Sequence, residues 1–144
     1  MEHFRENTIK VMKELIKNCG NAENLLRNSC DTMEDKSLHK IFLYYADLNK
    51  TYIKKLENEI LRLGGSVDEL QQEKVLPSVD KTNYTDKLRI CENGVSKAVN
   101  NYKEISLRED ILWEVIPIIS QQYFGEIEAR ETIRNINTQE VSEI

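Results

Sequence analysis

Residues 37–65 read SLHKIFLYYADLNKTYIKKLENEILRLGG, and this stretch decides the fold. Apolar side chains recur along it at three- and four-residue steps, which is typical of a helix with one buried face. The members of this stripe are Leu38, Ile41, Phe42, Tyr45, Leu48, Tyr52, Leu56 and Ile60. The glycine pair at 64–65 then ends the pattern, because glycine readily adopts the left-handed conformation found after helix C-termini. The sequence predicts a helix over residues 37–63.

Three other stretches carry the same periodicity and predict helices over residues 5–31, 84–105 and 107–137. The first stripe comprises Met12, Leu15, Ile16, Cys19, Ala22, Leu26 and Cys30. The stripe of the predicted third helix comprises Leu88, Cys91, Val95, Ala98, Val99 and Tyr102. The last stripe comprises Leu112, Val115, Ile116, Ile119, Tyr123, Ile127 and Ile133. Since no stretch alternates with a period of two, we expect an all-α protein.

The connections between these helices set the expected topology. Two of them are short, whereas residues 66–82 form a longer connection that contains Pro77. Short links usually join helices that pack as antiparallel neighbours. The sequence therefore predicts a ferritin-like, up-down-up-down four-helix bundle with a longer connection between the second and third helices, in a single domain over residues 1–144.

Local signals refine this picture. Residues 66–69 (Ser-Val-Asp-Glu) and 106–109 (Ser-Leu-Arg-Glu) both have the pattern of a capping box at a helix start. Pro117 lies inside the predicted fourth helix, so we expect a kink one turn earlier. Gly94 lies in the middle of the predicted third helix, where we expect another helix to approach closely.

Composition excludes several classes of protein. The 144 residues are 31% charged and 40% apolar, which is typical of a globular domain and not of a disordered chain. No apolar run approaches the ~20 residues that span a bilayer. The net charge of −5, with basic residues interleaved among acidic ones, argues against nucleic acid as the main partner. The N-terminal residues lack the layout of a secretory signal, so we expect a cytoplasmic protein if the chain starts natively at Met1.

Histidine and cysteine usage argues against metal or redox chemistry. Di-iron bundles take a glutamate from each of two helices and a Glu-x-x-His motif from each of the other two. Neither His3 nor His39 has a glutamate three residues before it, so the usual ligand set is absent and we expect no cofactor. Cys19, Cys30 and Cys91 lack CxxC spacing and are expected to be small buried thiols.

Carboxylates alone offer a weaker alternative for metal binding. Glu23, Glu57, Glu92 and Glu126 lie on four different predicted helices. Hard divalent cations accept ligand sets made only of oxygen atoms. Iron or another divalent metal bound by these residues is therefore the alternative to a chain without a cofactor.

The inward lines of the predicted helices also carry polar residues. Three- and four-residue steps place Glu23, Asn49, Tyr52, Glu126 and Arg130 in one layer of the core. Arg130 follows Glu126 by four positions, so the two can pair on one helix, and its guanidinium could also reach Glu23. Because buried charges must be paired, the hypothesis is a satisfied network where ferritin-like proteins hold metal. The alternative is that these residues lie at the rim of the core with their polar ends in water.

The chain resembles a bacterial ferritin-like family, known as a domain of unknown function of the four-helix-bundle type. The resemblance rests on residues 15–23 (LIKNCGNAE), the stretch 38–65, residues 91–94 (CENG) and the Gln-Tyr pair at 122–123, and it extends over residues 12–136. It implies a ferritin-like bundle that forms a homodimer, and it implies no established activity.

Two features depart from that family. Its members often carry a histidine late in the last helix, where Arg130 stands in this chain. The connection between the second and third helices is also shorter than the family leads us to expect. The first departure speaks against inherited metal chemistry.

Three functions remain open at this stage. The first is a non-enzymatic structural or interaction protein, in which Trp113 could lie at an interface. The second is a ferritin-like metal-binding protein or oxidoreductase with a carboxylate-rich core. The third is a small-ligand binder with a pocket near Gly94 and Pro117. Because no recognisable catalytic constellation is present, we lean away from an enzyme.

Overall fold

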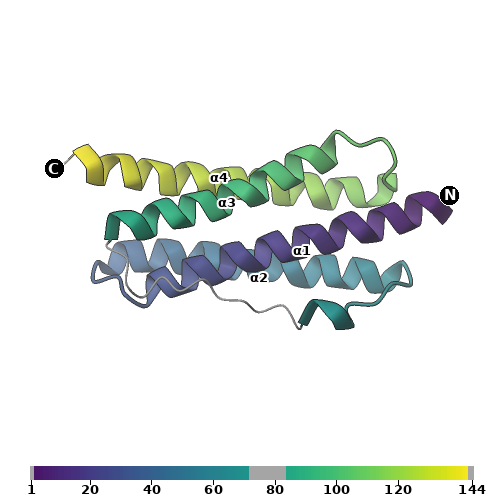
Figure 1. The fold of residues 1–144 in the computed structure, drawn as a ribbon, viewed down its shortest axis with the longest axis horizontal. Helices are drawn as coiled ribbons and strands as arrows, with labels where there is room; N and C mark the ends of the chain where they lie inside the picture. The colour runs from purple at the N-terminus through teal and green to yellow at the C-terminus, as the bar shows by residue number, and fades with distance from the viewer. Residues whose placement is uncertain (1, 72–83, 143–144) are drawn as a thin grey trace.

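The computed structural model describes residues 2–71 and 84–142. These residues form four α-helices, and two short 3-10 helices, η1 and η2, lie in the connections. The elements are α1 (Glu2–Cys30), α2 (Lys36–Arg62), η1 (Asp68–Gln71), α3 (Tyr84–Ser106), η2 (Trp113–Val115) and α4 (Ile116–Ser142). The prediction of an all-α four-helix bundle with a longer connection between α2 and α3 is confirmed (Figure 1).

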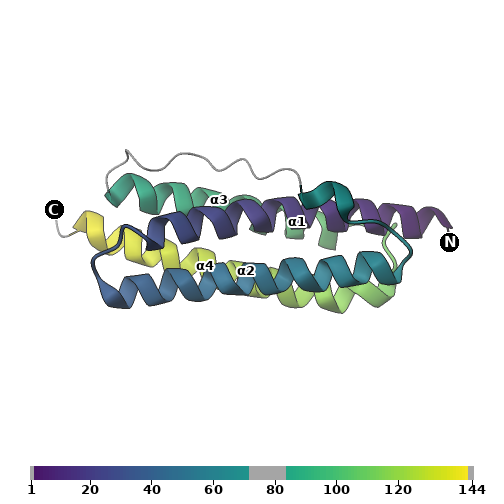
Figure 2. The same ribbon diagram turned by 90° about the horizontal axis from the view of Figure 1, so that it is seen from below.

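The helices form two antiparallel hairpins, α1 with α2 and α3 with α4, and α1 also packs against α3 (Figures 1 and 2). The end of α2 lies beside the start of α1, where Arg5 Nη1 donates a hydrogen bond to the Leu63 carbonyl oxygen at 2.5 Å. The start of α3 lies at the opposite end, where Ser29 Oγ and Cys91 Sγ are 3.0 Å apart. Consequently α2 and α3 point in the same direction, and the up-down alternation holds within each hairpin but not across the connection.

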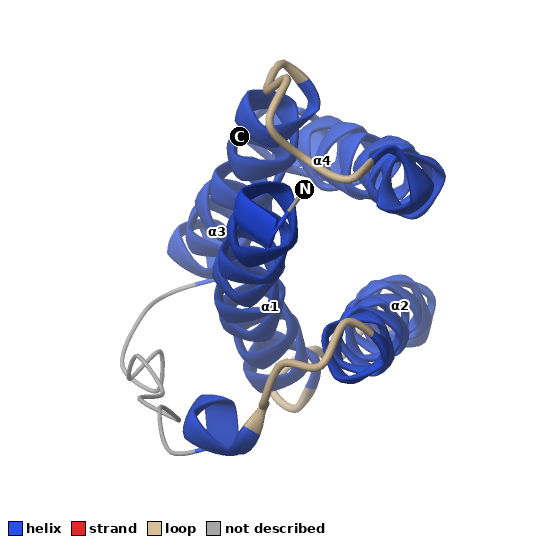
Figure 3. Ribbon diagram, turned by 90° about the vertical axis from the view of Figure 1, so that its right-hand side faces the viewer, coloured by secondary structure: helices blue, strands red, loops and turns tan. Residues whose placement is uncertain are grey.

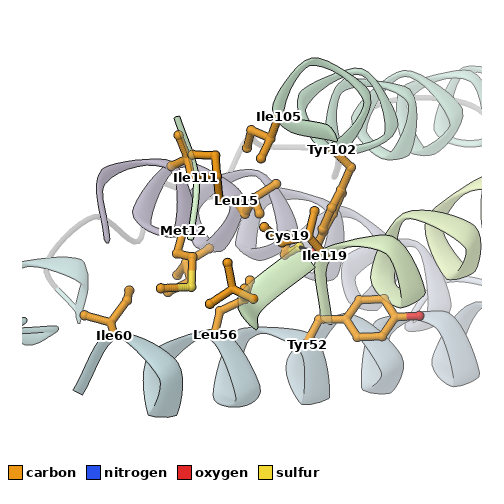
Figure 4. Close-up of a cluster of buried hydrophobic side chains, with 13 residues drawn as sticks. Met12, Leu15, Cys19, Tyr52, Leu56, Ile60, Tyr102, Ile105, Ile111 and Ile119 are labelled. Atoms are coloured by element: carbon orange, nitrogen blue, oxygen red, sulfur yellow. Dashed lines mark hydrogen bonds between the residues drawn. The ribbon is translucent and has the colours of Figure 1, made fainter. Parts of the chain in front are cut away.

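The core consists of two apolar clusters that follow each other along the bundle axis. Figure 4 shows the first cluster, to which all four helices contribute side chains. The predicted inward stripes of α1, α2 and α3 are largely buried, with Met12, Leu56 and Leu88 fully so. Each fully buried side chain of this size stabilises the fold by roughly 1.5–3 kcal/mol relative to an exposed one.

Both ends of α2 form as their residue types dictate. The Asp35 carboxylate accepts hydrogen bonds from the backbone amides of Ser37 at 2.8 Å and Leu38 at 3.2 Å, so Asp35 caps the first turn. At the other end Gly64 has φ +86° and follows the last helical turn. The predicted glycine stop is therefore confirmed.

Gly94 also has the role expected of it. A Cβ at this position would lie 2.5 Å from Leu25 Cδ1, so the missing side chain lets α1 pack closely on α3. None of the described helices is long and apolar enough to cross a membrane.

The start of the fourth helix was predicted wrongly. The capping box at 106–109 does not form, because Ser106 is the last residue of α3 and its hydroxyl donates to the Lys103 carbonyl at 2.7 Å. α4 begins only at Ile116, so Pro117 lies in its first turn. First-turn N–H groups have no partner within the helix, and a proline is tolerated there without a kink. The helix also continues to Ser142, beyond the predicted end at residue 137.

Residues 107–112, which connect α3 to η2, pack against the first turns of α1. Thr8 is fully buried, and its hydroxyl accepts a hydrogen bond from the Leu112 amide at 2.9 Å while donating to the Phe4 carbonyl at 2.7 Å. Nearby, Asn7 Nδ2 donates to Asp110 Oδ2 at 3.0 Å. These contacts satisfy a buried backbone amide and hold the entry to α4 against α1.

Candidate functional site

A polar layer crosses the core where the two apolar clusters meet. All four helices contribute to it, and its side chains lie among residues that are otherwise apolar. Its members are Cys19 of α1, Asn49 and Tyr52 of α2, Tyr102 of α3, and Gln122 and Glu126 of α4. Each of them is buried, so the polar atoms that are shut off from water need partners within the protein.

One half of this layer is a connected hydrogen-bond chain. Tyr102 Oη donates to Gln122 Oε1 at 2.5 Å, and Gln122 Nε2 donates to the Tyr52 carbonyl oxygen at 3.4 Å. Cys19 Sγ lies 3.2 Å from Tyr102 Oη. Because the phenol proton is used on Gln122, the Cys19 thiol is the donor in this contact. The chain links all four helices and leaves its members without net charge.

The other half of the layer contains buried polar atoms without hydrogen-bond partners. Glu126 is fully buried, and neither of its carboxyl oxygens has a hydrogen-bond partner. Asn49 Nδ2 donates to the Tyr45 carbonyl oxygen at 2.9 Å, but Asn49 Oδ1 is also buried without a partner. Burial raises the pKa of Glu126 to about 8, and the neighbouring Asn49 amide partly offsets that rise. Glu126 is therefore a largely neutral carboxylic acid at pH 7.

The groups around Glu126 do not supply a compensating positive charge. Burial raises the pKa values of the Cys19 thiol and of the Tyr52 and Tyr102 phenols, and the nearby Glu126 carboxyl raises them further. All three groups are consequently neutral near pH 7. The layer is thus a set of uncharged hydrogen-bonding groups around one buried carboxyl.

Only part of the predicted polar layer is brought together. Asn49, Tyr52 and Glu126 are buried as expected. Glu23 is half-buried and accepts a hydrogen bond from Arg27 Nε at 2.8 Å. The predicted pair between Arg130 and Glu126 does not form, because Arg130 Nε is directed to Glu131 Oε1 at 3.3 Å. A half-exposed guanidinium stays in contact with water, which costs less than burying it beside the carboxyl.

The polar layer also contains residues that the sequence reasoning missed. Cys19 and Tyr102 were assigned to apolar stripes, and no feature of the stripes distinguishes a core tyrosine from one in a hydrogen-bond chain. Gln122 was missed because the stripe of the fourth helix was followed from Ile119 to Tyr123. Continuing from Ile119 by three residues instead reaches Gln122 and then Glu126, which are both buried.

The residues of the metal-binding alternative do not converge. Across residues 2–71 and 84–142, no three His, Cys, Asp or Glu side chains come together in an arrangement that could hold a metal ion. Glu92 pairs with Arg134 Nε at 3.3 Å, and Glu57 lies half-buried on α2. Glu126 is the member of the set whose oxygens are buried without partners.

Comparison with known proteins does not identify a family. No family model matches the chain, and no curated protein matches it. Of the ferritin-like resemblance, the structure shows the all-α four-helix bundle.

Proposed function

We propose that this chain is a non-enzymatic structural or interaction protein of the ferritin-like class that acts by binding a second copy of itself. The connectivity supports the class, since bundles with one long crossover connection include the ferritin-like folds. The polar layer supports a role without metal chemistry, because its hydrogen-bond chain is built from neutral groups and its single carboxyl stands alone.

The observation that carries the binding role is the exposure of four large apolar side chains in the connection after α3 and in the first turns of α4. We call this set the Trp113 surface, and it consists of Leu107, Trp113, Ile116 and Phe124. The side chains of Trp113 and Phe124 are 79% and 68% exposed. Large aromatic side chains are enriched where proteins bind other proteins.

The charge distribution favours a second copy as the partner. The chain carries a net charge of −5, so two copies repel each other over most of their surfaces. Residues 115–125 contain no charged side chain, although 31% of the whole chain is charged. Two copies can therefore meet along the first turns of α4 without bringing like charges together, which supports a homodimer. The three free, buried thiols support a cytoplasmic location, where thiols stay reduced.

Light scattering coupled to size-exclusion chromatography tests the dimer. We expect the wild type to elute at twice the 16.9 kDa mass of the chain. Phe124→Glu should shift it toward the monomer, since a buried unpaired charge disfavours the interface. Tyr44→Glu is the matched control, because Tyr44 is an exposed aromatic residue on α2 outside the Trp113 surface. A wild type that stays monomeric at high concentration, with a normal helical circular dichroism spectrum, would contradict the proposal.

One observation favours the alternative function, a ferritin-like metal-binding protein or oxidoreductase. Buried carboxyl oxygens without partners, as in Glu126, are what an oxygen-ligated cation would satisfy. Elemental analysis of protein purified without chelator separates the two functions. Iron, manganese or zinc near one equivalent per chain, lost in Glu126→Gln, would establish the alternative. Sub-stoichiometric metal would remove it.

A further inference from the structure

The interface between α2 and α4 differs from the other helix contacts. Close backbone packing joins α1 with α2, α3 with α4, and α1 with α3. Among the described residues, α2 and α4 instead meet through side chains, and the end-on view places them apart on one side of the bundle (Figure 3). Tyr45 Oη lies 3.0 Å from Thr132 Oγ1, and the Tyr52 hydroxyl lies against Gly125. We call this interface the α2–α4 seam.

Three of the four buried polar atoms without a partner among the described residues belong to two residues of this seam, and the fourth is Asn137 Oδ1 near the end of α4. Asn49 of α2 presents Oδ1, and Glu126 of α4 presents two oxygens. An ionised carboxylate only accepts hydrogen bonds, so an ionised Glu126 and Asn49 Oδ1 would have no proton to share. The Asn49 amide beside Glu126 partly offsets the cost of the charge, but its Nδ2 serves the Tyr45 carbonyl and no hydrogen bond reaches either Glu126 oxygen. A proton on Glu126 supplies a donor for Asn49 Oδ1.

We propose that Glu126 is a proton-binding site that controls the α2–α4 seam. When protonated, Glu126 donates its O–H to Asn49 Oδ1 and holds α4 against α2. When it loses that proton, the seam contains a buried charge that the Asn49 amide compensates only in part, and water must enter to solvate it. The seam then opens while the tightly packed α1–α2, α1–α3 and α3–α4 contacts remain.

Other ionisable groups that face the site hold their proton or form ion pairs. Cys19 of α1, Tyr52 of α2 and Tyr102 of α3 interact with Glu126, and each holds its proton to higher pH than in water. Glu23 of α1 is neutralised by Arg27. On α4 itself, Arg130 lies one turn away and is paired with Glu131. Glu126 is thus the buried carboxyl of this set that has neither an ion-pair partner nor a hydrogen bond.

The sign of the pH dependence follows from the direction of the shift. The pKa of Glu126 is about 8 in the folded protein and 4.5 ordinarily, so the folded state binds this proton more tightly than the unfolded state does. The stabilisation is fully present below pH 4.5, falls as the pH rises, and is lost above about pH 8. Within that window the unfolding equilibrium constant should rise up to about tenfold per pH unit on account of Glu126.

Denaturant unfolding of three proteins between about pH 5 and about pH 9 tests this. Glu126→Gln keeps a donor for Asn49 Oδ1 but cannot ionise. Glu128→Gln is the control, since Glu128 is exposed on the same helix. The ratio of wild-type to Glu126→Gln unfolding constants should rise with pH and then level off, while Glu128→Gln follows the wild type. A ratio that does not depend on pH would overturn the proposal.

Two further measurements test the site and the seam directly. Carbon-13 NMR of glutamate-labelled wild-type protein should show one carboxyl titrating near pH 8, absent from Glu126→Gln. The titration of the wild type is informative even if the variant does not fold. A wild type whose carboxyls all titrate below pH 6 would by itself overturn the proposed proton-binding site. Hydrogen exchange, corrected for intrinsic rates, should show residues 45–52 and 122–129 opening more at pH 9 than at pH 6. Equal opening at both values would overturn the control of the seam.

Discussion

Single residues decide how closely the two hairpins approach in the seam, and Gly125 is the sharpest case. A Cβ built at this position would lie 1.7 Å from the Tyr52 hydroxyl oxygen and 2.9 Å from its Cζ. We therefore expect Gly125→Ala to destabilise the protein by about 1–3 kcal/mol, because the tyrosine ring or the helix must shift. Denaturant unfolding measures the change.

The chain offers a matched control for this prediction. Gly20 lies inside α1, and a Cβ there would make an ordinary 4.0 Å contact with Ile53 Cδ1. Gly20→Ala should stabilise the protein by about 0.5–1 kcal/mol, since alanine favours the helix over glycine. If Gly125→Ala stabilised the protein as Gly20→Ala does, the close contact with Tyr52 would be contradicted. Adding Tyr52→Phe to Gly125→Ala should recover part of the loss.

At this scale the sequence predicts which polar residues face inward better than it predicts their partners. Asn49 and Glu126 were placed in the core from helical spacing alone, and both are buried. The partner of Arg130 was not predictable, because both Glu126 and Glu131 lie within its reach on the same helix. The choice depends on the cost of removing a guanidinium from water, which is a property of the assembled core and not of the spacing.

At the scale of elements, the start of α2 depends on one side chain. The Asp35 carboxylate accepts from two first-turn amides, which otherwise lack partners in the helix. Asp35→Ala should lower the unfolding free energy by about 1 kcal/mol. Asp35→Asn should retain most of the stabilisation that the cap provides, because asparagine also accepts from first-turn amides. Glu34→Ala is the control at the adjacent exposed position. Equal stabilities of the two alanine variants in thermal or denaturant unfolding would contradict the capping role.

The boundaries of α1, α2 and α3 were predictable within a few residues, but the start of α4 was not. In α2, an apolar stripe and a glycine stop agree with each other. Before α4, residues 106–109 have the composition of a capping box, and an apolar run follows directly. The structure resolves this ambiguity through Thr8, whose hydroxyl satisfies the Leu112 amide and so stabilises an irregular connection. A contact between residues so distant in sequence leaves no periodic signal.

At the scale of the whole molecule, α1 is the central element. It packs against α2 and α3, contacts η1, and holds the connection into α4 through Thr8. α4 has one closely packed helical neighbour, α3, and faces α2 across the seam. Local opening is easiest where an element has few close neighbours, so α4 should open more readily than α1.

Native-state hydrogen exchange at weakly acidic pH should therefore show the highest protection in the middle of α1 and lower protection along α4. The Trp113 surface adds a concentration dependence to this pattern. If two copies meet there, residues 113–124 should become more protected as the protein concentration rises, while the middle of α1 should not change. Phe124→Glu should abolish this dependence on concentration, while α1 stays more protected than α4. Protection of α4 equal to that of α1 at every concentration would show that the seam is as tight as the other interfaces. The proton-controlled opening at Glu126 would then lack the weak interface on which it depends.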